Sequence, residues 1–371
     1  MSGRAASLDR VSTPHEIALL RLVAQRVVGP ALPTPLDVVA WLTALQAQDD
    51  AGALTSVALR SATRARADVI AAFDDGQIVR SWPMRGTLHT VVATDLVWML
   101  ELMTPRPRAA AAKRRSQLGL DENDVTRAHD LAVEALADRS TTAADPAGGL
   151  TRAELLAVWE AAGLAPAGGR GYHLIVELAQ LGVLCLGPLR DGAQLFVLAG
   201  AWVPEPRRPT RDEALAELAL RYFRGHGPAT IADLSRWSGL TAADVRAGTG
   251  AVRDQLDSMT VDGTQYLLDP ATPQRLADHQ GEAGGVVLLP GFDEIILGYA
   301  DRSMTLPPEF ADRIVPGGNG VFRPSVVADG RVVGTWRHVG KPTARRVETS
   351  AFTAFADDVA AAIPDLYARL P

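Results

Sequence analysis

The sequence predicts a mainly helical α+β protein that repeats one structural pattern three times and ends in a β-rich domain. Three observations indicate this class. The chain has 371 residues, of which 47% are hydrophobic. This number of hydrophobic residues is more than the core of one ordinary domain needs. Apolar residues recur at helical spacing in three successive regions, each closed by two β-rich runs around a turn. After Asp269, short apolar runs alternate with turns, as strands do.

The first repeat is expected over residues 10–100. Its predicted elements are three helices and a hairpin, in the order 14–27, 35–45, a helix from about residue 54, and β-rich runs 78–82 and 87–92. Between the two runs, Pro83 and Gly86 mark a turn.

The second and third repeats are expected over 120–200 and 210–270. In the second, the predicted elements are helices over 123–137, from the capping-box sequence 151–154, and over 171–181, then β-rich runs 183–186 and 194–198 around a turn at 188–192. In the third, they are helices over 229–238 and from the cap at 241–244 to about 256, then a hairpin 259–261 and 265–268 that turns on Asp262-Gly263.

Helix, helix, helix and hairpin follow one another in this order in winged-helix modules, a helix-turn-helix variant. The sequence therefore predicts three tandem winged helices and a β-rich C-terminal domain over 284–371. Winged helices often place one helix in a DNA groove, and others bind proteins. A DNA enzyme, a non-enzymatic DNA-binding protein and a protein-interaction scaffold all stay open at this point.

The charge distribution favours a DNA partner in spite of the overall balance. The net charge is −6, which by itself argues against nucleic acid. Two segments are locally basic, however: residues 60–115 hold ten Lys and Arg against five acids, and residues 323–346 hold six against one. Such segments are expected to form a basic groove on an acidic body.

Several function classes have no support in the sequence. Cys185 is the only cysteine, so neither a disulfide nor a cysteine-based zinc site is expected. Walker, Gly-x-Ser-x-Gly and His-Glu-x-x-His motifs are absent. No apolar stretch has the length of a signal peptide core or a membrane span. We expect a cytoplasmic, nucleoid-associated protein with no metal, no cofactor and no membrane contact.

Two polar patterns are candidates for chemistry. Gln46 and Gln48 follow a predicted helix, and their side chains point to the same side if the chain there is extended. Along the first hairpin, Arg85, Thr87 and His89 alternate and so share one face. Spacing alone also fits solvated polar residues at both places.

The surroundings of these residues resemble the bacterial winged-helix DNA glycosylases typified by AlkZ. The resemblance rests on Leu45 to Gln48, Met84 to His89, Leu289 to Asp301 and Gly334 to Trp336, and it covers nearly the whole chain. It implies that Gln46 and Gln48 are the catalytic pair, which places the chain in the Gln-x-Gln branch of the family. Members of that branch often protect producers of DNA-alkylating natural products.

The implied reaction is monofunctional hydrolysis of the N-glycosidic bond of N7-alkylguanine in double-stranded DNA, as in base excision repair. Bulky natural-product adducts and interstrand crosslinks are further candidate substrates. Alkylation at N7 makes the base cationic, so it leaves as a neutral molecule without an acid. Two amide oxygens then suffice to orient water and stabilise an oxocarbenium-like sugar.

The remaining site residues follow from the same interpretation. Asp49 or Asp50 is the alternative catalytic carboxylate, although adjacent aspartates also suit a helix start. Asp293 and Glu294 form a second acidic pair, read as structural or groove-lining, with Asp293 and Asp49 as possible site-lining residues. DNA contacts are expected from Arg85, Thr87, His89, Lys113, Arg114 and Arg115. We expect the protein to act as a monomer.

Overall fold

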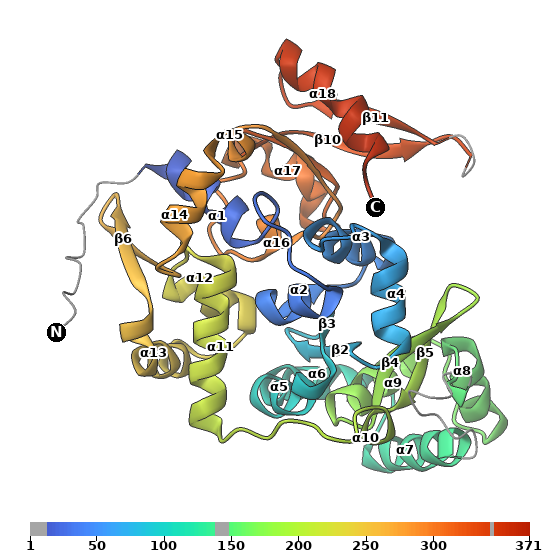
Figure 1. Cartoon of the computed structure of the whole chain (residues 1–371). Helices are drawn as coiled ribbons and strands as arrows, with labels where there is room; N and C mark the ends of the chain where they lie inside the picture. The colour runs from blue at the N-terminus through green and yellow to red at the C-terminus, as the bar shows by residue number, and fades with distance from the viewer. Residues whose placement is uncertain (1–12, 138–147, 342–344) are drawn as a thin grey trace. The chain divides into compact units, whose positions relative to one another are not determined.

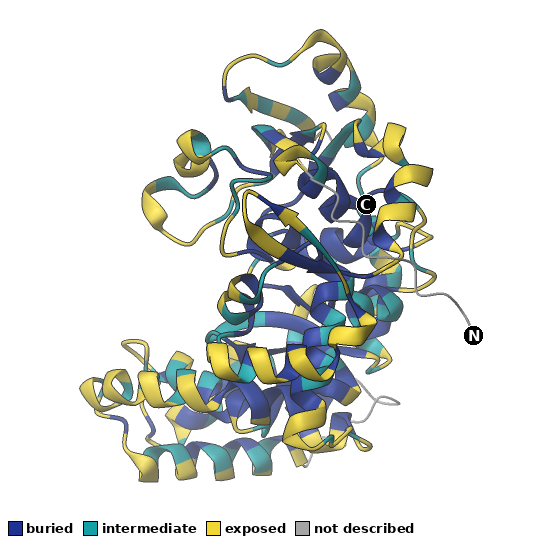
Figure 2. Ribbon diagram, turned by 90° about the vertical axis from the view of Figure 1, so that its left-hand side faces the viewer, coloured by how far each residue is buried: buried dark blue, intermediate teal, exposed yellow. Residues whose placement is uncertain are grey.

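The computed structural model describes residues 13–137, 148–341 and 345–371. The chain divides into two compact units. One combines the N-terminal segment up to Arg66 with residues 215–371, and the other spans 67–214. Helices α4 (Arg66–Asp74) and α11 (Arg211–His226) carry the chain from one unit to the next (Figure 1). In Figure 2, buried residues gather inside each unit and exposed ones on its outer helices and loops.

The discontinuous unit begins with α1 (Pro14–Ala24), α2 (Pro35–Leu42), the short strand β1 (Ala44–Gln46) and α3 (Asp50–Arg60). After α11, its next elements are α12 (Ile231–Ser238), α13 (Ala242–Ala251), β6 (Asp257–Val261), β7 (Thr264–Leu268), α14 (Thr272–Asp278) and α15 (Gln280–Ala283). The last part comprises β8 (Val286–Leu289), α16 (Glu294–Leu297), α17 (Ala311–Ile314), β9 (Ser325–Ala328), β10 (Arg331–Val339), β11 (Arg346–Ala351) and α18 (Asp357–Ala368).

The ends of the sequence share one core in this unit. Leu20 and Val23 of α1 pack in the same cluster as Leu289, Ile295 and Val327 from the C-terminal part. Strands β8 to β11 form an antiparallel sheet in the order β11-β10-β9-β8. Burial of apolar side chains, the main stabilising term of folding, therefore joins α1 to the C-terminal part. Hydrogen bonds bring residues 44–60 to the same part of the unit, since Gln46 binds Glu294 and Arg60 binds Asp293.

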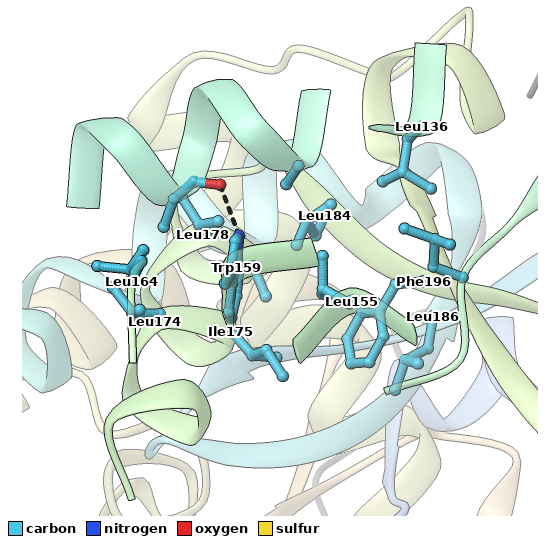
Figure 3. Packing of buried hydrophobic residues seen from close by; sticks show 14 of the residues in the cluster. Leu136, Leu155, Trp159, Leu164, Leu174, Ile175, Leu178, Leu184, Leu186 and Phe196 are labelled. Atoms are coloured by element: carbon cyan, nitrogen blue, oxygen red, sulfur yellow. Dashed lines mark hydrogen bonds between the residues drawn. The ribbon is translucent and has the colours of Figure 1, made fainter. Parts of the chain in front are cut away.

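The continuous unit contains β2 (Ile78–Met84), β3 (Thr87–Val92), α5 (Leu96–Met103), α6 (Pro105–Gln117), α7 (Glu122–Ala137), α8 (Arg152–Ala161), α9 (Arg170–Gln180), β4 (Leu184–Arg190), β5 (Ala193–Leu198) and α10 (Ala199–Trp202). Its hairpins join through an antiparallel pairing of Arg80 with Leu186. The core is centred on Trp159, whose Nε1 donates to the Ala128 carbonyl at 3.0 Å (Figure 3).

Many predicted elements are confirmed. The predicted strand 87–92 is β3, and β6 and β7 turn on Asp262-Gly263, both with the positive φ that such turns need. Thr151 and Glu154 form the expected reciprocal capping box. An antiparallel hairpin is present in each predicted repeat. The protein is thus mixed α and β, while the three-repeat winged-helix division and its four domain boundaries stay predictions.

Some predicted boundaries were wrong. The helix expected over 35–45 ends at Leu42, because its C-cap residue Thr43 adopts φ 70°, ψ −49°, and the strand β1 begins at Ala44. The helix expected to reach residue 256 ends at Ala251. The turn expected at 188–192 is confined to Asp191 and Gly192, which take positive φ while the flanking residues stay in β4 and β5.

Candidate active site and nucleic-acid interface

The two glutamines lie shortly after α2: Gln46 ends the strand β1, and Gln48 lies in the bend that follows it. Gln46 Nε2 donates to Oε1 of Gln48 at 3.0 Å, so the two amide groups meet on the same side of the chain. Gln46 is 7% exposed and Ala47 is fully buried, whereas Gln48 is exposed. The pair is a fixed amide group at the edge of the core with one member open to solvent.

The backbone enters this segment in an uncommon conformation. Thr43 is β-branched and has φ 70°, a region that costs such residues free energy, of order 1–3 kcal/mol. Strained residues of this kind concentrate at functional sites, where the surrounding structure holds them. The conformation of Thr43 is what turns the chain from α2 into β1 and so sets the direction of the glutamines.

The segment after the glutamines leads into α3. Asp49 is the N-cap residue of α3 and makes no side-chain capping bond, and Asp50 is exposed. The Asp49 carboxylate lies over Gly52, where an added Cβ would come within 2.7 Å of its Oδ2 and 3.0 Å of the Gly291 carbonyl. A side chain at position 52 would require Asp49 or the Gly291 backbone to shift, so α3 starts in close contact with the segment that leads to Asp293.

Asp293 is 2% exposed and lies beneath the site instead of lining it. Arg60 of α3 binds both of its oxygens, Nη2 to Oδ1 at 2.8 Å and Nη1 to Oδ2 at 2.9 Å. Ser56 donates to Oδ2 at 2.7 Å, and the Ile295 backbone amide donates to Oδ1 at 3.0 Å. A two-point pair of this kind is strongly directional. Asp293 therefore fastens α3 to the start of α16.

Glu294 contacts the glutamine segment itself. It is 1% exposed, and the backbone amide of Gln46 donates to its Oε1 at 3.0 Å. Trp237 Nε1 donates to its Oε2 at 3.0 Å, and His226 Nε2 lies 3.5 Å from the same oxygen. Sequence reasoning treated Glu294 only as structural or groove-lining. The available signal was a pair of acids between the apolar residues Phe292 and Ile295, since acids in an apolar run are buried only where they have partners.

Arg85 and Gly86 form the tip of the β2–β3 hairpin, both with positive φ. Arg85 Nη2 lies 3.1 Å from His89 Nε2, and His89 Nδ1 lies 2.8 Å from the Thr87 carbonyl. Because an arginine only donates, Nε2 accepts and Nδ1 carries the proton. His89 is fully buried. His89 thus lies beneath Arg85 at the hairpin tip, and the DNA contact expected of His89 stays a prediction.

The predicted basic residues of the continuous unit lie on α6. Lys113 and Arg114 are exposed, whereas Arg115 pairs with the buried Glu177 at 2.8 Å. Burial first, and then the charges of Arg114 and Arg115, lower the pKa of His173 below its usual value. Part of the predicted cluster thus has an internal partner, and the positive potential extends to α9.

A second positive group lies on the discontinuous unit. Burial first, and then Arg345 and Arg66, lower the pKa of His338 on β10. Burial and Arg345 also lower the pKa of Arg66, while Asp49 raises it. Arg66, His338 and Arg345 therefore share one electrostatic environment with the aspartate that follows the glutamines. Such a group attracts an anionic partner.

Among residues 13–137, 148–341 and 345–371, no cluster of three or more His, Cys, Asp or Glu side chains is arranged to hold a metal ion. Within the same ranges, no helix combines the length and apolar character required to cross a membrane.

The structure combines two hydrogen-bonded amides, buried carboxylates that hold their segment, and positive groups on the surface. These features define a candidate nucleic-acid enzyme, and comparison with known proteins agrees. Residues 39–370 match the family described as DNA glycosylase AlkZ-like, and the chain belongs to that family. It is 30% identical, over 351 residues and 88% of each chain, to an interstrand DNA cross-link repair glycosylase of Streptomyces sahachiroi. It also resembles the solved structure of the S. sahachiroi DNA glycosylase AlkZ, with a TM-score of 0.78 and 26% identity over 97% of this chain and 96% of that one.

Proposed function

We propose that the protein hydrolyses the N-glycosidic bond of N7-alkylguanine in double-stranded DNA and leaves an abasic site, with Gln46 and Gln48 as the catalytic pair. The observation that carries this proposal is the hydrogen bond between their amide side chains, from Gln46 Nε2 to Gln48 Oε1 at 3.0 Å. Both amides point to one side and do not titrate, so their dipoles keep one orientation over the whole physiological pH range. Preorganised dipoles of this kind stabilise charge that develops in a transition state.

The chemistry of the substrate explains why amides suffice. An N7-alkylated guanine carries a positive charge and departs as a neutral base, so no acid has to protonate it. The sugar becomes oxocarbenium-like as the bond breaks. The carbonyl dipoles of Gln46 and Gln48 stabilise this charge and orient the attacking water. An amide is a poor base, so undamaged purines, which are poor leaving groups, resist.

The reaction is proposed to be monofunctional. A lyase step requires an amine that forms an imine with the sugar. Lys113 and Lys341 are the only lysines of the chain, and both lie outside the glutamine segment. The proposed product is therefore an intact abasic site, with no strand cut by the protein itself.

The proposed substrate range extends to bulky adducts and interstrand crosslinks. Its support is the relative from S. sahachiroi, whose name assigns it interstrand DNA cross-link repair. We propose the same role here, in base excision repair or in protection against an alkylating natural product, with the protein acting as a monomer in the cytoplasm.

The test is release of base from alkylated duplex DNA. We expect the protein to release N7-alkylguanine, detected by chromatography, and to leave sites that break only on treatment with alkali. No trapped protein–DNA adduct should form with borohydride. If the protein binds the damaged duplex and releases no base from methyl or bulky adducts, a non-enzymatic DNA-binding protein becomes the better description.

The DNA interface is proposed to include Arg85, Thr87, His89, Lys113, Arg114 and Arg115. The first three belong to the β2–β3 hairpin, Lys113 and Arg114 are exposed on α6, and Arg115 of the same helix pairs with Glu177. Arginine and lysine at such positions contact phosphates and fix the protein on the duplex.

Arg85→Ala is expected to weaken DNA binding uniformly across sequences and to leave the fold intact. One phosphate contact is lost, so the slope of log affinity against log salt should fall by about 1. Binding titrations at several salt concentrations measure this. Arg190→Ala is the matched control. It removes an arginine of the β4–β5 hairpin that pairs with Glu154 of α8, and it should keep the slope. An Arg85→Ala protein that unfolds, yet has normal activity per folded molecule, would make Arg85 a structural residue.

DNA affinity is expected to rise as the pH falls from about 7.5 to about 5.5. In the free protein, burial and neighbouring arginines lower the pKa of His173 and of His338. Phosphates next to these arginines remove the repulsion, so the bound form has the higher pKa and takes up protons. As the pH falls, the gain in DNA affinity begins near the pKa of the histidine in the DNA-bound protein. It is complete below the pKa of the same histidine in the free protein. His173→Asn and His338→Asn should each flatten the pH profile in a binding titration. A flat wild-type profile would separate both histidines from the DNA.

A further inference from the structure

We propose that Glu294 is the positioning residue of the glutamine pair: its carboxylate fixes the backbone of Gln46 and thereby the direction of both amides. The proposal rests on the function proposed above. Its basis is the bond from the Gln46 backbone amide to Glu294 Oε1 at 3.0 Å, between two residues that are both buried. An N–H group that donates to a carboxylate forms one of the stronger hydrogen bonds of proteins.

The glutamine segment needs such an anchor. Strand β1 has only three residues, Ala44–Gln46, and Thr43 before it has a strained φ of 70°. The orientation of the Gln46 peptide plane sets the direction of the Gln46 side chain, and that side chain is hydrogen-bonded to the side chain of Gln48. Holding the amide of Gln46 therefore aligns Gln46 and Gln48 together.

Glu294 is itself held rigidly. Trp237 donates to its other oxygen at 3.0 Å. The preceding residue, Asp293, caps α16 and is bound at two points by Arg60. The two adjacent acids thus hold the chain at both ends of the motif. Glu294 binds the Gln46 amide at the end of β1, and Asp293 binds Arg60 of α3, which follows the motif. Supporting residues of this kind keep catalytic groups within a fraction of an ångström of the productive geometry.

A carboxylate is the group that this position requires. The Gln46 amide and the Trp237 indole both donate to it, one to each oxygen. A carboxylate only accepts, whereas an amide offers one accepting oxygen and one donating NH₂ group. With glutamine at position 294, either the indole or the Gln46 amide would face a donor. A buried donor without an acceptor is costly, so the segment would shift.

The first test is Glu294→Gln, in single-turnover release of N7-alkylguanine from alkylated duplex DNA. We expect release to slow roughly ten- to a hundredfold per folded molecule, as for a small misplacement of catalytic groups, with DNA affinity unchanged. Hydrogen exchange at the Gln46 amide should become faster. Asp233→Asn is the matched control, because Asp233 is a buried acid of the same unit that holds Thr230 and Ala300 instead. It should change neither the release rate nor the exchange at Gln46.

The second test is rescue. Trp237→Phe removes the competing donor, so in the double variant with Glu294→Gln the new amide can turn its oxygen towards Gln46. We expect the double variant to release base faster than Glu294→Gln alone, whereas a merely structural role predicts that a second core substitution only adds damage. If Glu294→Gln does not fold, Glu294→Asp keeps both acceptors but draws them back by one methylene, and should show the same slow release and fast exchange.

The outcomes separate this inference from the proposed function. Normal release and normal Gln46 exchange in Glu294→Gln would overturn the inference, as would equal slowing by Asp233→Asn. A wild-type protein that releases no base would overturn the proposed function and the catalytic part of the inference. Exchange at Gln46 would then still decide whether Glu294 anchors the segment.

Discussion

Gln46→Ala and Gln48→Ala are each expected to slow release of N7-alkylguanine by roughly ten- to a thousandfold, or ~1.4–4 kcal/mol in the barrier, as when one preorganised dipole is removed from a transition state. The effect should lie in the chemical step, because a neutral amide adds nothing to the attraction of phosphates. Single-turnover release and a separate binding titration distinguish the two steps. Loss of Gln48 also removes the acceptor for Gln46 Nε2, so the double variant should lose less than the sum of the two effects.

Asp49→Asn is the control for this experiment. Asp49 lies at the start of α3 and makes no capping bond with its side chain, so the exchange of one oxygen for an NH₂ group should leave release nearly unchanged. If Asp49→Asn abolishes release while both glutamine variants stay fast, the reaction uses a carboxylate, and the role proposed for the amides is refuted.

Arg60→Met is expected to have the largest effect on stability, a loss of about 3–5 kcal/mol in the free energy of unfolding. Arg60 and Asp293 are 0% and 1% exposed in their side chains, and the change leaves the carboxylate buried without its cation. Because the chain has two compact units, unfolding need not be a single transition. Urea unfolding followed by hydrogen exchange can assign the lower midpoint to the unit that contains Arg60.

Arg337→Met supplies the comparison. Arg337 pairs with Glu348 on the sheet surface, where the side chains are 69% and 52% exposed. Solvent screens such pairs, so a loss of no more than about 1 kcal/mol is expected. Equal losses in the two variants would mean that the Arg60 pair contributes no more than a surface pair and that α3 is held by packing alone.

Local sequence signals predicted the local structure well. The Asp262-Gly263 turn, the Thr151 capping box and the strand 87–92 each depend on residues a few positions apart, and all three are present. The boundary at Thr43 could not be read in this way. A threonine does not favour φ 70°, and it adopts this angle because tertiary contacts hold the segment that follows.

The same contrast between local and long-range signals applies to the candidate site. The shared direction of Gln46 and Gln48 is one of the two cases that the sequence allowed. The roles of Asp293 and Glu294 depend on contacts with Arg60 and Gln46, more than 230 residues away. Pairings at such separations leave no periodic trace in a single sequence. The burial of His89 was missed for a similar reason, since alternation along a strand distinguishes two faces without showing which one is covered.

The anchoring of the glutamines by an acid 248 positions later has a consequence for synthesis of the protein. A ribosome that adds about 5–20 residues per second needs roughly 12–50 s to travel from Gln46 to Glu294. During this interval residues 67–214 emerge complete and can fold, whereas the segment with the glutamines has none of its late partners. On the proposed function, we therefore expect a nascent chain to have the residues of the proposed DNA interface before the proposed catalytic pair is ordered. Base release would then require the complete chain up to Glu294 and its partners.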